Sequence, residues 1–467
     1  MSGAVAQLIS NGPQDLYFIG NPQITFFKNV YKRYTNFSVE AIKVATQNNS
    51  SLSMDNSTTM TFYVDRNGDL LSECWLEIFL PPTQNGGNNA SYVNWRNNTG
   101  HGLIEHIELK IGGATIDKHS GYFLDILNEL DMNGEKEHIG LNKHSTLIYA
   151  KDSNGDSQNC PPLRLYIPLK FYFNTNKGLS LPLIGLQYHE VEIIVKFRPL
   201  RELIISDKQQ PTTIDLRGDT QVNLWGNYVF LDKDERTKFA QSKHEYLVNR
   251  VSEKVTSASS NTIDISEFNM PTKELFFVFT DSNRNLNCKE SICDPLSFTA
   301  PNITHNSGTY TFTSGNTSNC DDLFNYEFSK NITLTSGLDN FVKDSGMSLY
   351  NNKYLESFEK FNLKVLGQTN RFTAKEASYF RIVTPVQAGY KVPSKHIYYY
   401  SFSLDAENNQ PKGAANFSKL ENKSLFFDGN NTNQLFSDSN NRDIRIFTVN
   451  YNILRIMSGM AGYAFAN

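Results

Sequence analysis

Few residues of this sequence have the types and spacing that metal binding or catalysis requires. Asp152, Asn154 and Asp156 alternate as oxygen ligands do at the start of a calcium-binding loop. The sixth position of that loop lacks the required glycine, and Leu163 stands where a glutamate would close the site. A plain polar turn is therefore the better prediction for this segment.

Histidine and cysteine patterns also argue against a metal enzyme. The nine histidines include no His-x-His pair, and His101 and His106 are five residues apart. The five cysteines form no C-x-x-C motif, so reduced thiols are expected; pairing of Cys288 with Cys293, in one loop-like segment, stays open. No nucleophile elbow and no phosphate-binding loop motif occurs. We therefore expect no enzyme, no cofactor, no catalytic residue and no metal site.

Composition favours β-structure with polar loops. The 467 residues include 32 Phe and 23 Tyr, whereas only 39% are hydrophobic, which fits ring-rich strands better than helices or disorder. The length suits two domains of about 200 residues each. A net charge of -4 argues against direct coating of nucleic acid. No apolar run could span a bilayer and no secretory signal is evident, so we expect folding in a cytosol.

Two segments about 250 residues apart have the same alternation of apolar and polar residues. In residues 106–113 and 360–367, apolar and polar side chains alternate, which is typical of a strand with one buried face. Two residue pairs recur in the same order in both halves: Tyr122-Phe123 with Tyr379-Phe380, and Asn227-Tyr228 with Asn450-Tyr451. These echoes predict a β domain that is duplicated within the chain.

The remaining elements follow from the same patterns. We expect helices near 27–34 and 120–131, and long loops at 81–102 and 281–351. The second loop is predicted as a surface insertion with some strand structure of its own. Strands are expected near 36–46, 57–64, 72–80, 106–113, 145–150, 163–170, 187–197, 221–231, 244–256, 260–267, 273–280, 356–366, 396–404, 415–427 and 443–455.

The predicted fold class is all-β, with two antiparallel sandwiches in tandem. The strand near 190 should pack on one side only, since its second face is mostly polar. We expect an N-terminal arm with a short helix at 1–34, a first domain at 35–231, a charged linker at 232–242, and a second domain at 243–467 that carries the 281–351 insertion.

Four segments resemble, in the same order, the major capsid proteins of large icosahedral double-stranded DNA viruses, a group that includes phycodnaviruses and marseilleviruses. The segments are 20–37, 234–248, 408–422 and 450–467. The resemblance runs from about residue 13 to the last residue and leaves mainly the loops uncovered, above all 281–351. The chain departs from the family pattern in the turn at 412–415.

The resemblance implies a double jelly roll, that is, two eight-stranded sandwiches side by side. Three chains with six similar lobes would form a pseudo-hexagonal capsomer that tiles an icosahedral shell. Segments 81–102 and 281–351, each after the fourth strand of its domain, would be its outer tops. Implied partners are further copies, minor capsid proteins and penton proteins, with an inner viral membrane reached only through minor proteins. The protein would reside in the virion capsid and assemble in the host cytoplasm.

Two kinds of interaction residue follow from the sequence. The arm is expected to contact neighbouring capsomers or minor capsid proteins; the alternative is packing on its own domain. Its candidate residues are Phe26, Phe27, Lys28, Tyr31, Lys32 and Arg33. Asn302, Asn316 and Asn331 lie in glycosylation sequons, although a chain rich in Asn, Ser and Thr forms such sequons by chance. The alternative function is a carbohydrate-binding or deglycosylating double jelly-roll protein.

Overall fold

The computed structural model describes most of both predicted domains. Described are residues 3–46, 51–85, 93–96, 98–131, 162–206, 214–216, 218–281, 302–306, 309–313, 323–324, 326, 332–335, 358–367, 369–393, 395–406, 408–428 and 442–465. The chain forms two compact units, Met1–Phe37 and Ser38–Asn467.

The first unit contains two short helices, α1 (Gly3–Ile9) and α2 (Leu16–Ile19). Residues 27–34 contain no helix, so the helix predicted there is wrong. Its apolar stripe has no core to pack against within this unit, because Phe27, Val30 and Tyr31 are all exposed. Isolated helices of such length are marginal in water, since most helical stability comes from packing.

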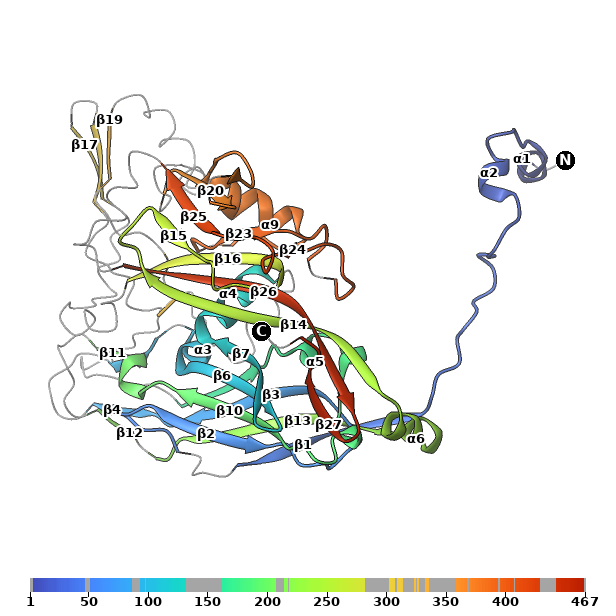
Figure 1. Cartoon of the computed structure of the whole chain (residues 1–467), viewed down its shortest axis with the longest axis horizontal. Helices are drawn as coiled ribbons and strands as arrows, with labels where there is room; N and C mark the ends of the chain where they lie inside the picture. Colours follow the sequence, from blue (N-terminus) through green and yellow to red (C-terminus); the bar gives the residue numbers. More distant parts are fainter. Residues whose placement is uncertain are drawn as a thin grey trace. The chain divides into compact units, whose positions relative to one another are not determined.

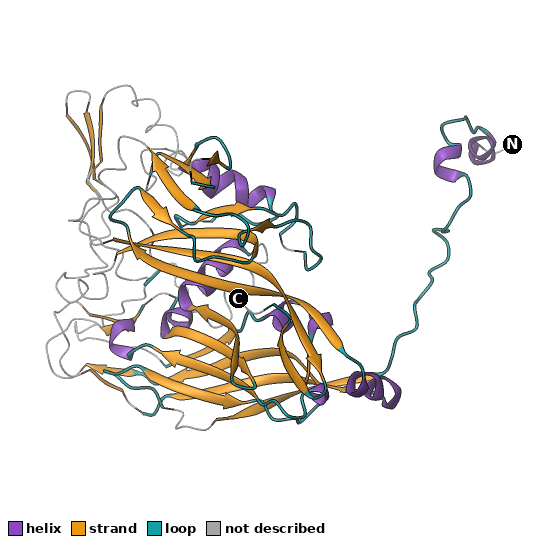
Figure 2. Cartoon of the chain, viewed as in Figure 1, coloured by secondary structure: helices purple, strands orange, loops and turns teal. Residues whose placement is uncertain are grey.

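The first half of the second unit contains a nine-stranded sheet that folds over on itself into two packed layers (Figures 1 and 2). One layer has the order β7-β6-β10-β2 and the other β1-β13-β3-β8, and the pairing of β1 with β2 joins them. The strands are β1 (Phe37–Thr46), β2 (Thr58–Tyr63), β3 (Leu70–Leu80), β6 (Ile104–Ile111), β7 (Ala114–Ser120), β8 (Leu163–Pro168), β10 (Val191–Phe197) and β13 (Gln221–Leu231).

The second half repeats this arrangement. Its sheets have the orders β14-β26-β16-β23 and β15-β25-β20-β21. The strands are β14 (His244–Ser257), β15 (Thr262–Asp264), β16 (Pro271–Asp281), β20 (Lys360–Val365), β21 (Thr369–Asn370), β23 (Tyr398–Ser401), β25 (Ser424–Asp428) and β26 (Arg442–Met457). Two strand layers with the same neighbours in both halves are the double jelly roll that the sequence predicted.

Both halves carry the same irregularity at the same rung. The β13–β3 ladder passes over Ser72, and the β26–β16 ladder passes over Lys273. Each is the third residue of an 11-residue strand, and each is the extra residue of a β-bulge. The rungs also show that the Asn-Tyr echo is one residue out of register, because Tyr228 occupies the position of Asn450.

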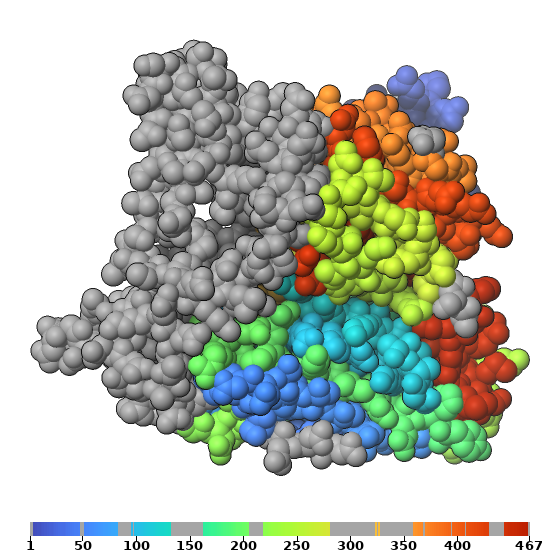
Figure 3. All heavy atoms as spheres, turned by 60° about the vertical axis from the view of Figure 1, so that its left-hand side comes forward, coloured from blue at the N-terminus to red at the C-terminus, as the bar shows by residue number. Residues whose placement is uncertain are grey.

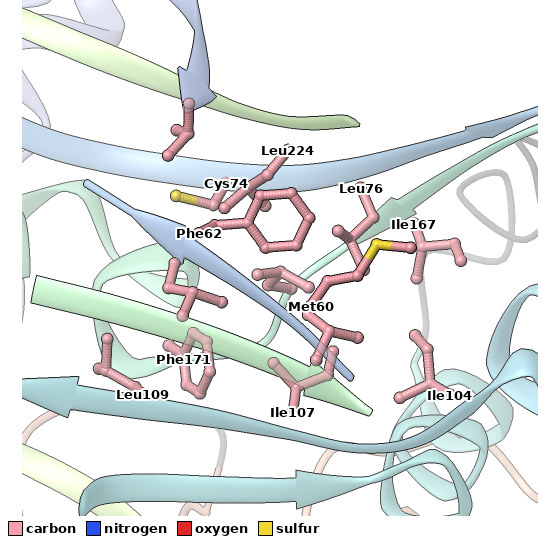
Figure 4. Packing of buried hydrophobic residues seen from close by; sticks show 14 of the residues in the cluster. Met60, Phe62, Cys74, Leu76, Ile104, Ile107, Leu109, Ile167, Phe171 and Leu224 are labelled. Carbon is pink, nitrogen blue, oxygen red and sulfur yellow. The ribbon is translucent and has the colours of Figure 1, made fainter. Parts of the chain in front are cut away.

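The period-2 patterns place one face of each strand in a core. In β10 buried residues alternate with half-buried ones, which confirms packing on one side. Figure 4 shows part of the first core, with residues of β2, β3, β6, β8 and β13 pointing toward one another: Met60, Phe62, Cys74, Leu76, Ile107, Leu109, Ile167 and Leu224. The second core is more aromatic and includes Phe277, Phe279, Phe358, Phe361, Tyr398 and Phe427.

The other predicted helix is present, and a further helix lies in the predicted linker. α4 (Gly121–Leu130) confirms the helix near 120–131, and the side chain of Ser120 accepts a hydrogen bond from Phe123 N at its start. α6 (Lys233–Gln241) lies within segment 232–242. The remaining helices are α3 (Thr99–Leu103), α5 (Tyr172–Thr175), α9 (Thr384–Gln387), a π-helical turn at Tyr379–Val383, and 3-10 turns at Lys177–Leu179, Leu183–Gly185 and Leu200–Leu203.

The two long loops contain structure of their own. β17 (Asn302–Asn306), β18 (Thr309–Thr313) and β19 (Ile332–Thr335) form a three-stranded sheet within 281–351, which confirms strands in the insertion. Both loops follow the third strand of their half, β3 or β16, and not the fourth. The predicted strand near 145–150 lies outside the described residues. The remaining strands are β4 (Thr83–Asn85), β5 (Val93–Trp95), β9 (Leu181–Pro182), β11 (Ile204–Ser206), β12 (Ile214–Leu216), β22 (Lys375–Glu376), β24 (Ala415–Asn416) and β27 (Met460–Tyr463).

Candidate interaction surfaces

The outer face of the β26-β16-β23 sheet is covered by α4 from the other half. The apolar residues of α4 recur at the i, i+3, i+4 and i+7 spacing of one helix face. The ring of Phe123 lies 5.6 Å from that of Phe447 on β26 and 6.3 Å from that of Phe276 on β16. Phe276 and Phe447 are fully buried. The helix therefore closes an aromatic interface between the halves.

This cover explains the apolar run in β16. Phe276 and Val278 belong to the cluster beneath α4, whereas Leu275 and Phe277 belong to the second core. A strand that is covered on both faces needs apolar residues at successive positions and loses the alternation of a half-exposed strand.

A buried ion pair fixes α4 at this interface. Asp125 of α4 is fully buried and lies 3.0 Å from the ammonium nitrogen of Lys395 in the other half. It also accepts hydrogen bonds from the hydroxyl of Tyr326, at 3.0 Å, and from the amide of Asn98, at 3.3 Å. A buried carboxylate is tolerated when its oxygens are satisfied in this way.

Tyr326 belongs to the long insertion, which is therefore anchored in the interior. Leu323, Phe324 and Tyr326 are buried in the same cluster as α4. The ring of Phe324 lies 5.1 Å from that of Tyr122 in an edge-on arrangement. This anchor was not predicted from the sequence, although the short aromatic run 323–328 stands out within a segment rich in Asn, Ser and Thr.

Two other buried carboxylates have structural partners, and one of them, Asp117, joins the halves. An oxygen of Asp117 on β7 accepts the backbone N–H of Val251 on β14 at 3.0 Å, while the other lies 2.8 Å from Nε2 of His119. Glu274 on β16 accepts the hydroxyls of Tyr390 and Tyr399, each at 2.9 Å. Burial raises the pKa of Glu274. The carboxylates of Asp117 and Glu274 are therefore hydrogen-bonded to groups that have structural roles.

The end of the chain returns to the first half. Leu454, Ile456 and Ala461 are buried in the first core. Nδ1 of His189 accepts the backbone N–H of Ala461 at 3.1 Å, and the hydroxyl of Tyr463 donates to the carbonyl of Ile116. In Figure 3 these C-terminal strands, in red, lie beside cyan and green atoms of the first half.

The outer face of the β13-β3-β8 sheet carries half-buried aromatic and acidic residues. Trp225 on β13 lies directly opposite Trp75 on β3, and both are half-buried. Oε2 of Glu77 accepts the indole N–H of Trp225 at 2.8 Å, and this bond holds the pKa of Glu77 below its usual range. This face was not predicted from the sequence, although two of the three tryptophans occupy outward positions of paired strands.

The six candidate residues of the arm are all exposed, with Phe26 at 90% and Phe27 at 98%. The structure does not bring them together into a site. The neighbouring Leu16, Tyr17 and Phe18 are exposed as well, so the first unit presents an unusual amount of apolar surface.

Several other candidates lie outside the described residues: Asn316, Asn331, Cys288, Cys293 and the segment 152–156. Asn302 is the first residue of β17. His101 lies in α3 and His106 on β6, where burial lowers the pKa of His106. Within the described residues, no group of three His, Cys, Asp or Glu is placed to hold a metal ion. No helix in the described part of the chain is long and apolar enough to cross a membrane.

Sequence comparison gives matches over both halves. A family described as the major capsid protein N-terminus matches residues 25–232, and one described as the large eukaryotic DNA virus major capsid protein matches residues 235–462. The major capsid protein of Phaeocystis pouchetii virus is 33% identical, and that of Paramecium bursaria Chlorella virus 1 is 31% identical. Both alignments cover 100% of this chain and 100% of the relative.

Solved structures agree with the fold. PBCV-1 VP54, fitted into a reconstruction of the virophage Sputnik, matches with a TM-score of 0.68 at 26% identity and covers 95% of this chain and 100% of its own. The Faustovirus major capsid protein has a TM-score of 0.64 at 12% identity, with 96% and 94% covered, and shows the fold alone. The sequence match at full length, together with the repeated sheets, leads to one conclusion. The chain belongs to the family of major capsid proteins of large eukaryotic DNA viruses.

Proposed function

We propose that this chain is the structural subunit of an icosahedral capsid and that three copies form one pseudo-hexagonal capsomer. The observation that carries the proposal is the duplication: both halves have the same strand order and the same bulge. Three chains then supply six similar lobes, and a threefold complex with six lobes can tile a nearly hexagonal lattice. Relatives named as major capsid proteins and a match to the PBCV-1 virus capsid support this role.

The role is structural and needs no catalysis. The relatives are capsid proteins, and the buried carboxylates Asp117, Asp125 and Glu274 have structural partners. The relatives also favour the shell over the carbohydrate-binding alternative. The protein's place is the capsid of the virion, with assembly in the cytoplasm of the infected host cell. Its partners are further copies, minor capsid proteins and penton proteins.

The domain division follows the proposed lobes. The first jelly roll spans 35–231, the linker 232–242 and the second jelly roll 243–467 with its insertion. In support, α6 lies within the linker and the two family matches meet between residues 232 and 235. The exposed arm residues named above are the proposed contacts with neighbouring capsomers or minor capsid proteins.

The native mass of the purified chain tests the capsomer. Light scattering after size exclusion should give about three times the chain mass of 53.0 kDa. A monomer at every micromolar concentration, retained on a glycan column, would instead support the carbohydrate-binding alternative.

A further inference from the structure

The helical segment Tyr379–Gln387 of the second half is the counterpart of α4. Leu124 of α4 is buried in the first core, and Phe380 is buried in the second, so each helix turns this residue toward its own sandwich. Aligned on these two positions, the α4 stripe Phe123, Ile126, Leu127 and Leu130 corresponds to Tyr379, Ile382, Val383 and Val386. The Tyr-Phe echo of the two halves is therefore out of register by one residue.

The two stripes differ in what covers them. The stripe of α4 is packed on the β26-β16-β23 sheet, with Phe123, Ile126 and Leu130 fully or almost fully buried. In the second half Val383 is 39% exposed and Val386 is 56% exposed. Tyr379 and Ile382 are half-buried. The C-terminal part of this apolar face, at Val383 and Val386, thus lacks the cover that α4 has.

The outer face of the β13-β3-β8 sheet, in contrast, has aromatic residues that no helix in the described part of the chain covers. Counted from the shared bulge, Trp75 and Trp225 of the first half occupy the rungs of Phe276 and Phe447. Phe276 and Phe447 are fully buried beneath α4, whereas the two tryptophans are half-buried on an outer face. The tryptophan pair of the first half therefore occupies the same rung as the phenylalanine pair of the second half but has none of the described helices packed on it.

We infer that the segment Tyr379–Gln387 of one copy packs on the outer face of the β13-β3-β8 sheet of a second copy, as α4 packs on β26-β16-β23 within the chain. The inference rests on the proposed capsomer and names its subunit contact. A helix-to-sheet contact of this kind is heterologous, because it joins two different surfaces. Such contacts close into a ring of three copies when each contact rotates the next copy by one third of a turn. A trimer would then contain six similar helix-to-sheet contacts, three within the chains and three between them.

Charged side chains lie beside both apolar surfaces. The sheet face carries Glu73 and Glu77, and the pKa of Glu77 is lowered, so it stays ionised at neutral pH. The ammonium nitrogen of Lys375 lies 5.9 Å from the ring of Tyr379 at the start of the exposed stripe. Glu73 and Glu77 are already paired with Lys177 at 3.7 Å and with Arg164 at 3.4 Å on the same face. The proposed contact therefore rests on the uncovered apolar residues and not on charge.

Paired variants test the inference. Val383→Arg with Val386→Arg places two charges in the docking face, whereas Leu404→Arg, at a residue that is 89% exposed and outside the stripe, is the matched control. We expect the double variant to raise the concentration at which trimers dissociate by at least about 100-fold, while the control stays trimeric. Circular dichroism of each variant confirms that the chain is folded.

A photo-cross-linking residue at position 386 gives an independent measurement in an otherwise unchanged chain. Mass spectrometry should find cross-links between copies to peptides of β3 or β13. If wild type forms trimers but the double variant forms them equally well, or the cross-links lead elsewhere, this contact is wrong while the capsomer stands. A wild-type chain that stays monomeric overturns both.

Discussion

Asp125 and Glu274 are both buried where the two halves meet, but their surroundings differ. Asp125 has Lys395 at 3.0 Å, while the nearest ammonium to Glu274, on Lys273, is 3.7 Å away. Desolvation raises the pKa of Glu274 despite the two tyrosine hydroxyls that hydrogen-bond to it. The raised pKa makes Glu274 a group through which folding stability can depend on pH.

Glu274→Gln should reduce the dependence of the free energy of unfolding on pH. Because burial raises the pKa of Glu274 above its ordinary value of 4.5, the folded chain holds this proton more tightly than the unfolded chain does. Its contribution is full below pH 4.5 and is lost as the pH rises through the raised pKa. Relative to the variant, the wild-type free energy of unfolding should thus decrease from pH 4.5 to neutral in denaturant titrations. A difference that does not change with pH would contradict this prediction.

Gly112 and Gly113 form a matched pair in the turn between β6 and β7. Both have positive φ, +58° and +79°, so alanine at either position should cost about 1 kcal/mol. A Cβ on Gly112 would lie 2.5 Å from Nδ1 of His189, whereas a Cβ on Gly113 would meet nothing within 4 Å. Gly112→Ala should therefore lose about 1–3 kcal/mol more than Gly113→Ala in chemical denaturation. Equal losses would show that His189 moves without cost.

At the scale of elements, the insertion depends on its anchor. Phe324→Ala should release the anchor, because the lost ring leaves a cavity beside Tyr122. Local opening should become easier by about 3 kcal/mol, so limited proteolysis within 281–351 should be about 100-fold faster. Phe324→Leu, which keeps most of the apolar volume, is the control and should lie between. Unchanged cleavage would mean that the described sheet β17-β18-β19 holds the insertion by itself.

At the scale of the whole molecule, the arm and the sandwiches should have separable roles. Deletion of residues 1–23 removes α1 and α2 but leaves the residues of both cores intact. We expect the truncated protein to form soluble trimers and to fail in lattice formation, as seen by electron microscopy of assembly reactions. Intact shells from the truncated chain would count against the arm as a contact between capsomers.

The sequence by itself determined most strands and the duplicated fold. The alternation in β6, β10 and β20 predicted their buried faces, since neighbouring side chains of a strand point to opposite sides. This signal is local and needs no knowledge of the partner. The helix predicted at 27–34 failed for the complementary reason, because an apolar stripe becomes a helix only when something covers it.

Only the tertiary structure decided which surfaces meet. The insertion anchor at Tyr326 and the ion pair of Asp125 with Lys395 join residues 201 and 270 positions apart, and no local periodicity records such pairs. The repeats were visible in the sequence, but their alignment was not. Matching the Asn-Tyr pairs aligns the two halves one residue away from the alignment that the shared β-bulge gives. Register is a property of hydrogen-bonded rungs between distant strands, and these exist only once the chain has folded.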